Sequence, residues 1–232
     1  MWGLAIIKPL SVVAGLMGLA IATLPYVAVP TPAMPETRRI TLPAGTELRV
    51  AVREVTRREW QACVEASACA ALAPKPRTGE PDMPMTGVNH LDVEAYLRWV
   101  NAATAKSYRL PTSSEWQVIA ADLPVPVSKQ IFTDPRLSWA ADYGTMQRVS
   151  AVLRASGSFG TFANGIADLE GNVWEWTSTC TMKGAESDRC PAYVAEGLHE
   201  AVVSVFVRDP ASGGCAVGAP PANLGFRLVA DE

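Results

Sequence analysis

Residues 171–177 and 223–227 are the two segments whose residue types and spacing are best suited to chemistry. In the first, Gly-Asn-Val-Trp-Glu-Trp-Thr, the carboxylate of Glu175 lies between two tryptophans. The Gly171-Asn172 step lets the backbone turn sharply, so that carbonyl oxygens and a carboxylate can point toward one position. Such hard oxygen ligands suit a hard cation. The pattern predicts a core strand beside a bound cation.

A hairpin is the first element expected to support this motif. From Arg39 to Val55 apolar and polar residues alternate on both sides of the Pro-Ala-Gly-Thr sequence at 43–46. Alternation on either side of a turn sequence is typical of two half-buried antiparallel strands. We therefore expect an exposed hairpin at the start of the folded part.

Three helices are expected after the hairpin. The sequence Thr-Arg-Arg-Glu at 56–59 is a capping box and predicts a helix to about Ala66. Apolar residues at helical spacing predict a second helix over 92–105. A further capping box at 112–115 opens a short helix that carries Trp116.

Short apolar runs in the last third predict strands at 173–176, 201–207 and 226–229. Residues 122–167 show no sustained period and contain scattered Pro, Gly and Ser, so we expect long loops there. Helices followed by a loop-rich β portion predict an α+β fold rather than alternating βαβ units.

Composition excludes one broad class of function. The chain has 232 residues and a net charge of -3, and its basic pairs at 38–39 and 57–58 extend into no longer basic run. Nucleic-acid-binding surfaces need a concentrated positive field, which this sequence lacks. We expect no nucleic-acid partner, and one domain over residues 39–232.

The N-terminal segment 1–29 predicts export. Residues 9–29 contain no charge, and Lys8 is the only charge before them. The uncharged stretch is short for a membrane-spanning helix, and Ala20-Ile21-Ala22 matches the small-x-small pattern of signal cleavage. A cleaved signal peptide is favoured, with an uncleaved anchor as the alternative. A Pro-rich linker over 30–38 then leads to a domain outside the cytoplasm.

Export favours disulfides among the five cysteines, because thiols pair in oxidising compartments. Cys63 and Cys69 are close enough in sequence for a local bridge. Two of Cys180, Cys190 and Cys215 are expected to form a second bridge, and the sequence does not choose between them. A zinc site is not expected, because Cys-x-x-Cys is absent and only two histidines occur.

Five segments in the right order resemble the sulfatase-modifying factor family, whose best-known member is the formylglycine-generating enzyme. The resemblance spans about residues 48–230 and implies a loop-rich variant of the C-type lectin fold with bound calcium. The matching segments are 54–56 (Glu-Val-Thr), 84–88 (Pro-Met-Thr-Gly-Val), 109–116 (Arg-Leu-Pro-Thr-x-x-Glu-Trp), 165–177 (Gly-Ile-x-Asp-Leu-x-Gly-Asn-Val-Trp-Glu-Trp-Thr) and 223–227 (Asn-Leu-Gly-Phe-Arg).

The resemblance also implies a set of calcium ligands, which are the side chains of Asp168 and Glu175 and the carbonyls of Gly171 and Val173. Two buried carboxylates so close together need a compensating cation. In the alternative without calcium, Asp168 caps a turn and Glu175 forms an ion pair with Arg227.

A second family calcium site maps to Asp142 with the carbonyl of Tyr143, but its later acidic ligand has no counterpart here. The tryptophans at 116, 174 and 176 are expected in the core.

The copper site of the formylglycine-generating enzyme is not expected in this chain. The family holds copper(I) with two cysteines set five residues apart, because thiolates suit a soft ion. The family spacing from residue 223 leads back to Ser204 and His199 instead. If copper binds at all, His199 with Cys215 or Cys190 is the pair to test.

The tail from Phe206 to Arg227 resembles the NirV-type subgroup, which is found beside copper nitrite reductase. This resemblance implies a periplasmic or membrane-anchored accessory protein that supports or matures that reductase. The first alternative is a copper-dependent oxidase of protein cysteine with a rebuilt metal site. The second is a carbohydrate-binding module, which the fold alone suggests.

Overall fold

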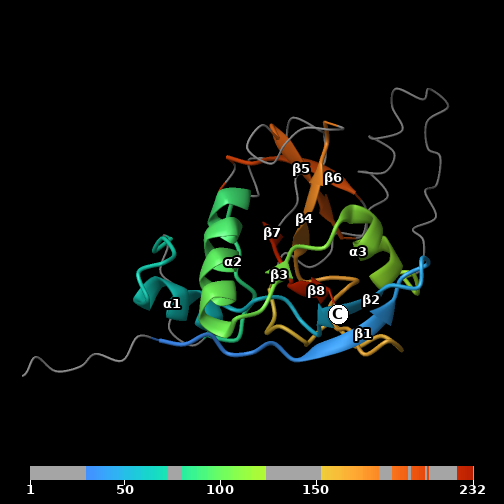
Figure 1. Ribbon diagram of the computed structural model, residues 1–232, viewed down its shortest axis with the longest axis horizontal. Helices are drawn as coiled ribbons and strands as arrows, with labels where there is room; N and C mark the ends of the chain where they lie inside the picture. The colour runs from blue at the N-terminus through green and yellow to red at the C-terminus, as the bar shows by residue number, and fades with distance from the viewer. Residues whose placement is uncertain are drawn as a thin grey trace, which may run out of the picture.

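In the computed structural model, the described residues are 30–72, 80–123, 153–182, 190–197, 200–206, 208 and 224–231. The chain forms three helices and two four-stranded sheets within these ranges (Figure 1). The α+β class expected from the sequence is confirmed. None of these helices has the length and apolar character needed to cross a bilayer.

The first sheet has the strand order β1-β2-β8-β3. The predicted hairpin is confirmed, since β1 (Thr37–Thr41) pairs antiparallel with β2 (Glu47–Ala51). β8 (Val229–Asp231) pairs with β2 and with the short β3 (Tyr108–Arg109). β1 begins inside the range expected to be linker, and the Glu36 carbonyl just before it accepts a hydrogen bond from the Val52 amide.

The second sheet has the order β6-β5-β4-β7 and contains the tryptophan motif. β4 (Trp174–Cys180) pairs antiparallel with β5 (Ala192–Glu196), which pairs with β6 (Ala201–Ser204). β7 (Leu224–Gly225) pairs parallel with β4. β6 ends at Ser204, short of the strand predicted to 207, and the sequence did not indicate β5.

The strand predicted over 226–229 is wrong for residues 226–228. Residues 226–228 form no strand, because the chain leaves the second sheet after β7 and enters the first at β8. The side chains of Phe226, Arg227 and Leu228 are nevertheless buried. The apolar run therefore marks a buried crossing between the two sheets, which periodicity cannot distinguish from a buried strand.

All three helices begin at a capping box. The predicted boxes at Thr56 and Thr112 are present and open α1 (Arg57–Glu65) and α3 (Ser113–Ile119). α2 (His90–Thr104) starts two residues earlier than expected, at an Asn89–Asp92 box in which each side chain bonds the other residue's backbone N–H. Asn89 and Asp92 thereby bind backbone N–H groups that have no partner within the first turn of the helix, as Ser or Thr with Glu does in the usual capping box.

Two buried clusters form the core. The larger one lies between α1, α2 and the second sheet and includes Trp60, Tyr96, Trp176 and Phe226. The smaller one packs α3 against the first sheet and includes Leu48 and Trp116. Trp116 and Trp176 are thus core residues as expected, whereas Trp174 is only half-buried.

Candidate functional site

A buried ion pair lies where the two sheets meet. Glu175 is on β4, and Arg227 is on the crossing between β7 and β8. The Arg227 Nε donates to Glu175 Oε2 at 2.6 Å and its Nη2 donates to Oε1 at 2.5 Å, while the side chains are 0% and 1% exposed. The Trp116 indole on α3 also donates to Oε2, at 2.9 Å. One carboxylate therefore joins the second sheet, the crossing between the sheets and α3.

The remaining guanidinium N–H groups bind backbone carbonyls. Arg227 Nη2 donates to the Ala167 carbonyl at 3.0 Å, and Nη1 donates to the Ala51 carbonyl at 3.3 Å. A buried guanidinium is tolerated only when its charge and its N–H groups are satisfied in this way. The planar fork of arginine makes these simultaneous contacts possible.

Asp168 lies beside this pair and organises the loop before β4. It is 1% exposed and its φ is 63°, a conformation in which Asp is several-fold enriched among non-glycine residues. Its carboxylate accepts hydrogen bonds from the backbone amides of Gly157 and Phe159, the second at 2.7 Å. Asp168 therefore holds the loop 157–160 against the turn that leads into β4.

Glu54 is a further buried carboxyl in this cluster, and no sequence pattern pointed to a role for its side chain. Its Oε1 accepts a hydrogen bond from the Asn172 side-chain amide at 3.1 Å, whereas Oε2 is buried and has no hydrogen-bond partner among the described residues. Burial raises the pKa of Glu54 to about 8, with Asp168 and Glu175 acting in the same direction and Arg227 opposing them. A carboxyl with this pKa is mostly protonated at neutral pH.

The predicted calcium ligands lie on one turn and the start of β4, but the oxygens of Asp168, Glu175 and Gly171 already have protein partners. Both oxygens of Asp168 and of Glu175 accept hydrogen bonds, and the Gly171 carbonyl accepts one from the Val173 amide at 3.0 Å. Both contacts of the calcium-free alternative are present. A cation would have to use the remaining lone pairs of these oxygens.

Side chains alone supply no metal cage in the part of the chain that the structure describes. It contains no group of three His, Cys, Asp or Glu residues placed to hold a metal ion. The calcium ligand set therefore stays a prediction. Asp142 and Tyr143, expected in a second calcium site, lie outside the described residues.

Both expected disulfides are present. Cys63 pairs with Cys69 as predicted, and Cys180 pairs with Cys190. The cysteines within the described ranges are thus all oxidised, and Cys215 lies outside those ranges.

Of the weak catalytic candidates, only Ser204 is among the described residues, and it is at the end of β6 opposite Ala192. His199 and Cys215 lie outside them. The geometry of the described residues therefore assembles no catalytic group from these candidates.

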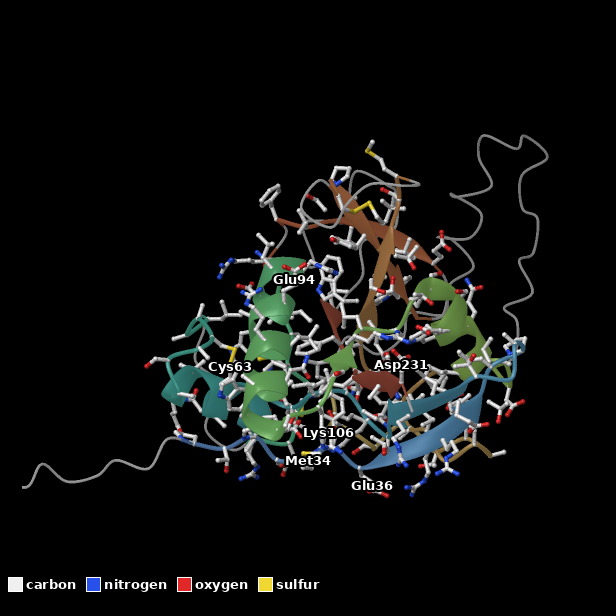
Figure 2. The ribbon with its side chains drawn as sticks, viewed as in Figure 1. Met34, Glu36, Cys63, Glu94, Lys106 and Asp231 are labelled. Carbon is white, nitrogen blue, oxygen red and sulfur yellow. A yellow bond between two sulfur atoms is a disulfide. The ribbon has the colours of Figure 1, made fainter. Side chains whose placement is uncertain are left out.

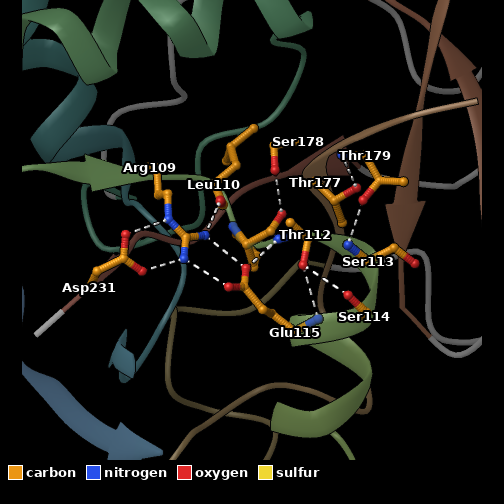
Figure 3. A network of polar contacts seen from close by, with 11 residues as sticks. Arg109, Leu110, Thr112, Ser113, Ser114, Glu115, Thr177, Ser178, Thr179 and Asp231 are labelled. Carbon is orange, nitrogen blue, oxygen red and sulfur yellow. Dashed lines mark hydrogen bonds and ion pairs between the residues drawn. The ribbon is translucent and has the colours of Figure 1, made fainter. Parts of the chain in front are cut away.

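The motif at 109–116 forms a structural network (Figure 3). Arg109 makes a bidentate contact with Glu115 on α3, with both distances 2.8 Å, and also contacts Asp231 on β8. This guanidinium ties α3 to the first sheet. The motif residues are therefore explained by packing and charge pairing rather than by a reactive site.

Sequence reasoning also missed a buried polar cluster on β5 and α3. Ser113 Oγ donates to Glu196 Oε1, and the Gln117 amide donates to the same oxygen at 3.2 Å. Burial raises the pKa of Glu196, and its hydrogen bonds from Ser113 and Gln117 oppose that shift. No spacing signal links residues so far apart in sequence.

Comparison with known proteins identifies the family. The model of the sulfatase-modifying factor enzyme 1-like domain matches residues 36–232. Hercynine oxygenase from Mycolicibacterium smegmatis is 33% identical over 104 residues, which is 42% of this chain and 22% of the relative. The match therefore spans less than a quarter of that relative's length.

Solved structures support the same fold. PvdO from Pseudomonas aeruginosa superposes with a TM-score of 0.56 and 18% identity, covering 87% of this chain and 92% of that one. Treponema denticola variable protein 1 gives a TM-score of 0.50 and 15% identity, with 80% and 85% covered. These structures share the fold, and the family match over residues 36–232 means that the chain belongs to the sulfatase-modifying factor enzyme 1-like domain family.

Proposed function

We propose that this chain is an exported accessory protein with a formylglycine-generating-enzyme-like fold, which supports or matures a copper nitrite reductase in the periplasm. The observation that carries the proposal is the oxidation of the described cysteines. They form two disulfides, Cys63–Cys69 and Cys180–Cys190. Thiolates tied up in disulfides cannot hold copper(I). Disulfides also suit the export predicted from residues 1–29.

The buried charges favour a scaffold rather than a reactive centre. The side chains of Glu175 and Arg227 are almost completely enclosed, so substrate cannot reach them without opening the core. Loops presented by such a rigid core are the usual place for protein recognition. The resemblance of the tail to the NirV-type subgroup supports copper nitrite reductase as the proposed partner.

We also propose calcium as the stabilising ion at Asp168, Gly171, Val173 and Glu175. Two buried carboxylates, those of Asp168 and Glu175, face Arg227, the one buried guanidinium among the described residues, so negative charge is in excess even with Glu54 protonated. The unpartnered Glu54 Oε2 is a further sign of an incompletely balanced cluster. Hard oxygens in excess suit calcium.

An oxidase is the second candidate, and the similarity to hercynine oxygenase favours it. In this alternative His199 and Cys215 rebuild a copper site that oxidises a protein cysteine. Carbohydrate binding is the third reading, and it rests on the fold alone.

Copper(I) titration against a competing chelator separates the first two candidates. The oxidised protein is compared with its His199→Ala and Cys215→Ser variants, and oxygen uptake is followed with a cysteine-containing peptide. The accessory role predicts no copper site of micromolar affinity and no peptide-dependent oxygen uptake. A tight site that either substitution abolishes would establish the oxidase instead.

A second experiment tests the partner directly. Copper nitrite reductase is purified from cells with and without this chain, and its copper content and specific activity are measured. The accessory role predicts that both fall without the chain and recover when it is restored. Unchanged copper content and activity would remove the nitrite reductase from the proposal.

A further inference from the structure

His90 is buried at the point where α2 meets the second sheet. It is the first residue of α2 and is 4% exposed. Its ring stacks on Tyr193 of β5 with centroids 3.5 Å apart and planes 2° apart, and it meets Trp176 of β4 edge-on at 5.6 Å. This single side chain therefore contacts both central strands of the second sheet.

The two ring nitrogens of His90 have different surroundings. Nδ1 lies 3.1 Å from the Glu94 Oε1, one helical turn further along α2. An ionised carboxylate only accepts hydrogen bonds, so Nδ1 carries the proton of the neutral ring. Nε2 is buried, and no described residue accepts a hydrogen bond from it or donates one to it within normal hydrogen-bond geometry. A second proton would have to enter at this unpartnered atom.

The environment of the ring favours its neutral form. Burial lowers the pKa of His90, and this outweighs the Glu94 carboxylate and the backbone of Thr177, both of which favour the charged form. Glu94 lies at the end of α2 nearer the second sheet (Figure 2).

The other groups around the ring do not reverse this balance. Asp92 is occupied by Arg208 at 3.1 Å and by the Asn89 amide at 3.0 Å. β5 presents the neutral phenol of Tyr193, and β4 presents the uncharged Trp176 and Thr177.

We propose that His90 is a proton-sensitive clasp: its neutral ring holds the start of α2 against β4 and β5, and uptake of a proton at Nε2 releases this contact in mild acid. The charged ring would carry a buried N–H between two aromatic side chains, where the Thr177 backbone compensates only part of the lost hydration. An unsatisfied buried charge is costly, so the protonated ring is more stable in water than in this site.

The direction of the pH effect follows from linkage. The opened form has the ordinary histidine pKa of about 6.5, and the closed form has a lower pKa. Acid therefore favours opening, and the opening constant rises by up to about tenfold per pH unit between the two pKa values. Below the pKa of the closed form the effect levels off.

The test uses the fact that the chain has only two histidines. Nuclear magnetic resonance of the two imidazoles gives their pKa values in the folded protein, and a His199→Gln variant assigns them. Amide hydrogen exchange of Thr177 and Tyr193 between pH 7 and pH 5, corrected for intrinsic rates, reports the opening. His90→Phe keeps an aromatic ring but cannot titrate.

We expect His90 to titrate below 6.5, and exchange at both amides to accelerate in acid in the wild type but not in His90→Phe. Glu94→Gln keeps an acceptor at Nδ1 but removes the favourable charge, so it should lower the pKa of His90 further. That measurement stands even if His90→Phe does not fold. A His90 pKa at or above 6.5, or the same acid acceleration in His90→Phe, would overturn the clasp.

Discussion

Replacing Arg227, the positive partner in the buried ion pair with Glu175, is the most direct test of how the two sheets are held together. Arg227→Met keeps the length and much of the volume of the side chain but leaves Glu175 without a positive partner. The guanidinium and carboxylate are bonded at 2.5 Å and 2.6 Å and are 0% and 1% exposed. Breaking such a pair from one side costs about 3–5 kcal/mol.

This cost is a large share of the stability of a single domain, which is about 5–15 kcal/mol. The Trp116 indole remains as a donor to Glu175, so the loss should fall at the lower end of the range. The double variant Arg227→Met/Glu175→Leu, which removes both charges, should recover a large part of it. Urea unfolding followed by tryptophan fluorescence, with disulfides intact, measures each free energy.

An exposed ion pair provides the matched control. Arg58 and Asp82 are bonded at 3.0 Å but are 64% and 67% exposed, so Arg58→Met should cost less than about 1 kcal/mol. The reasoning is refuted if Arg227→Met is as mild as Arg58→Met, or if the double variant is no more stable than Arg227→Met alone. Either result would mean that Glu175 does not depend on Arg227.

Three other substitutions probe the same core. Glu54→Gln should remove a pH dependence of stability. The pKa of Glu54 rises from 4.5 to about 8 on folding, so in calcium-free buffer the free energy of unfolding of the wild type should fall by up to about 5 kcal/mol as the pH rises between these values, and equal slopes of that free energy against pH in the two proteins would contradict this. Gly225→Ala should cost about 1–3 kcal/mol in urea unfolding, because a Cβ there lies 2.9 Å from the Met85 carbonyl oxygen; a cost below that range would show that β7 can shift. With calcium proposed at Asp168, millimolar calcium should raise the melting temperature of the wild type but not of Asp168→Asn, and an equal shift in both would argue against the site.

The features that the sequence predicted well depend on residues close together in the chain. The capping boxes at Thr56 and Thr112, the hairpin around residues 43–46 and the Cys63–Cys69 bridge are each contained in one short segment. A capping box is a local exchange of hydrogen bonds between residues three apart, so its outcome hardly depends on the rest of the fold.

Tertiary structure decided the features that join distant segments. Nothing in the sequence around Glu54 indicates that it lies buried beside Asn172, and the run at 226–228 reads as a strand although it crosses between sheets. His90 likewise meets Tyr193 only after α2 packs on the second sheet.

The difference has one physical reason. Propensity and periodicity report the free energy of local conformations, whereas burial and pairing of charges depend on which surfaces are removed from water together. The sequence therefore determined where α1 and α3 begin, the hairpin and one disulfide. Only the folded chain decided that Arg227 pairs with Glu175, which the sequence had offered as one alternative, that Glu54 keeps its proton, and that His90 contacts two strands.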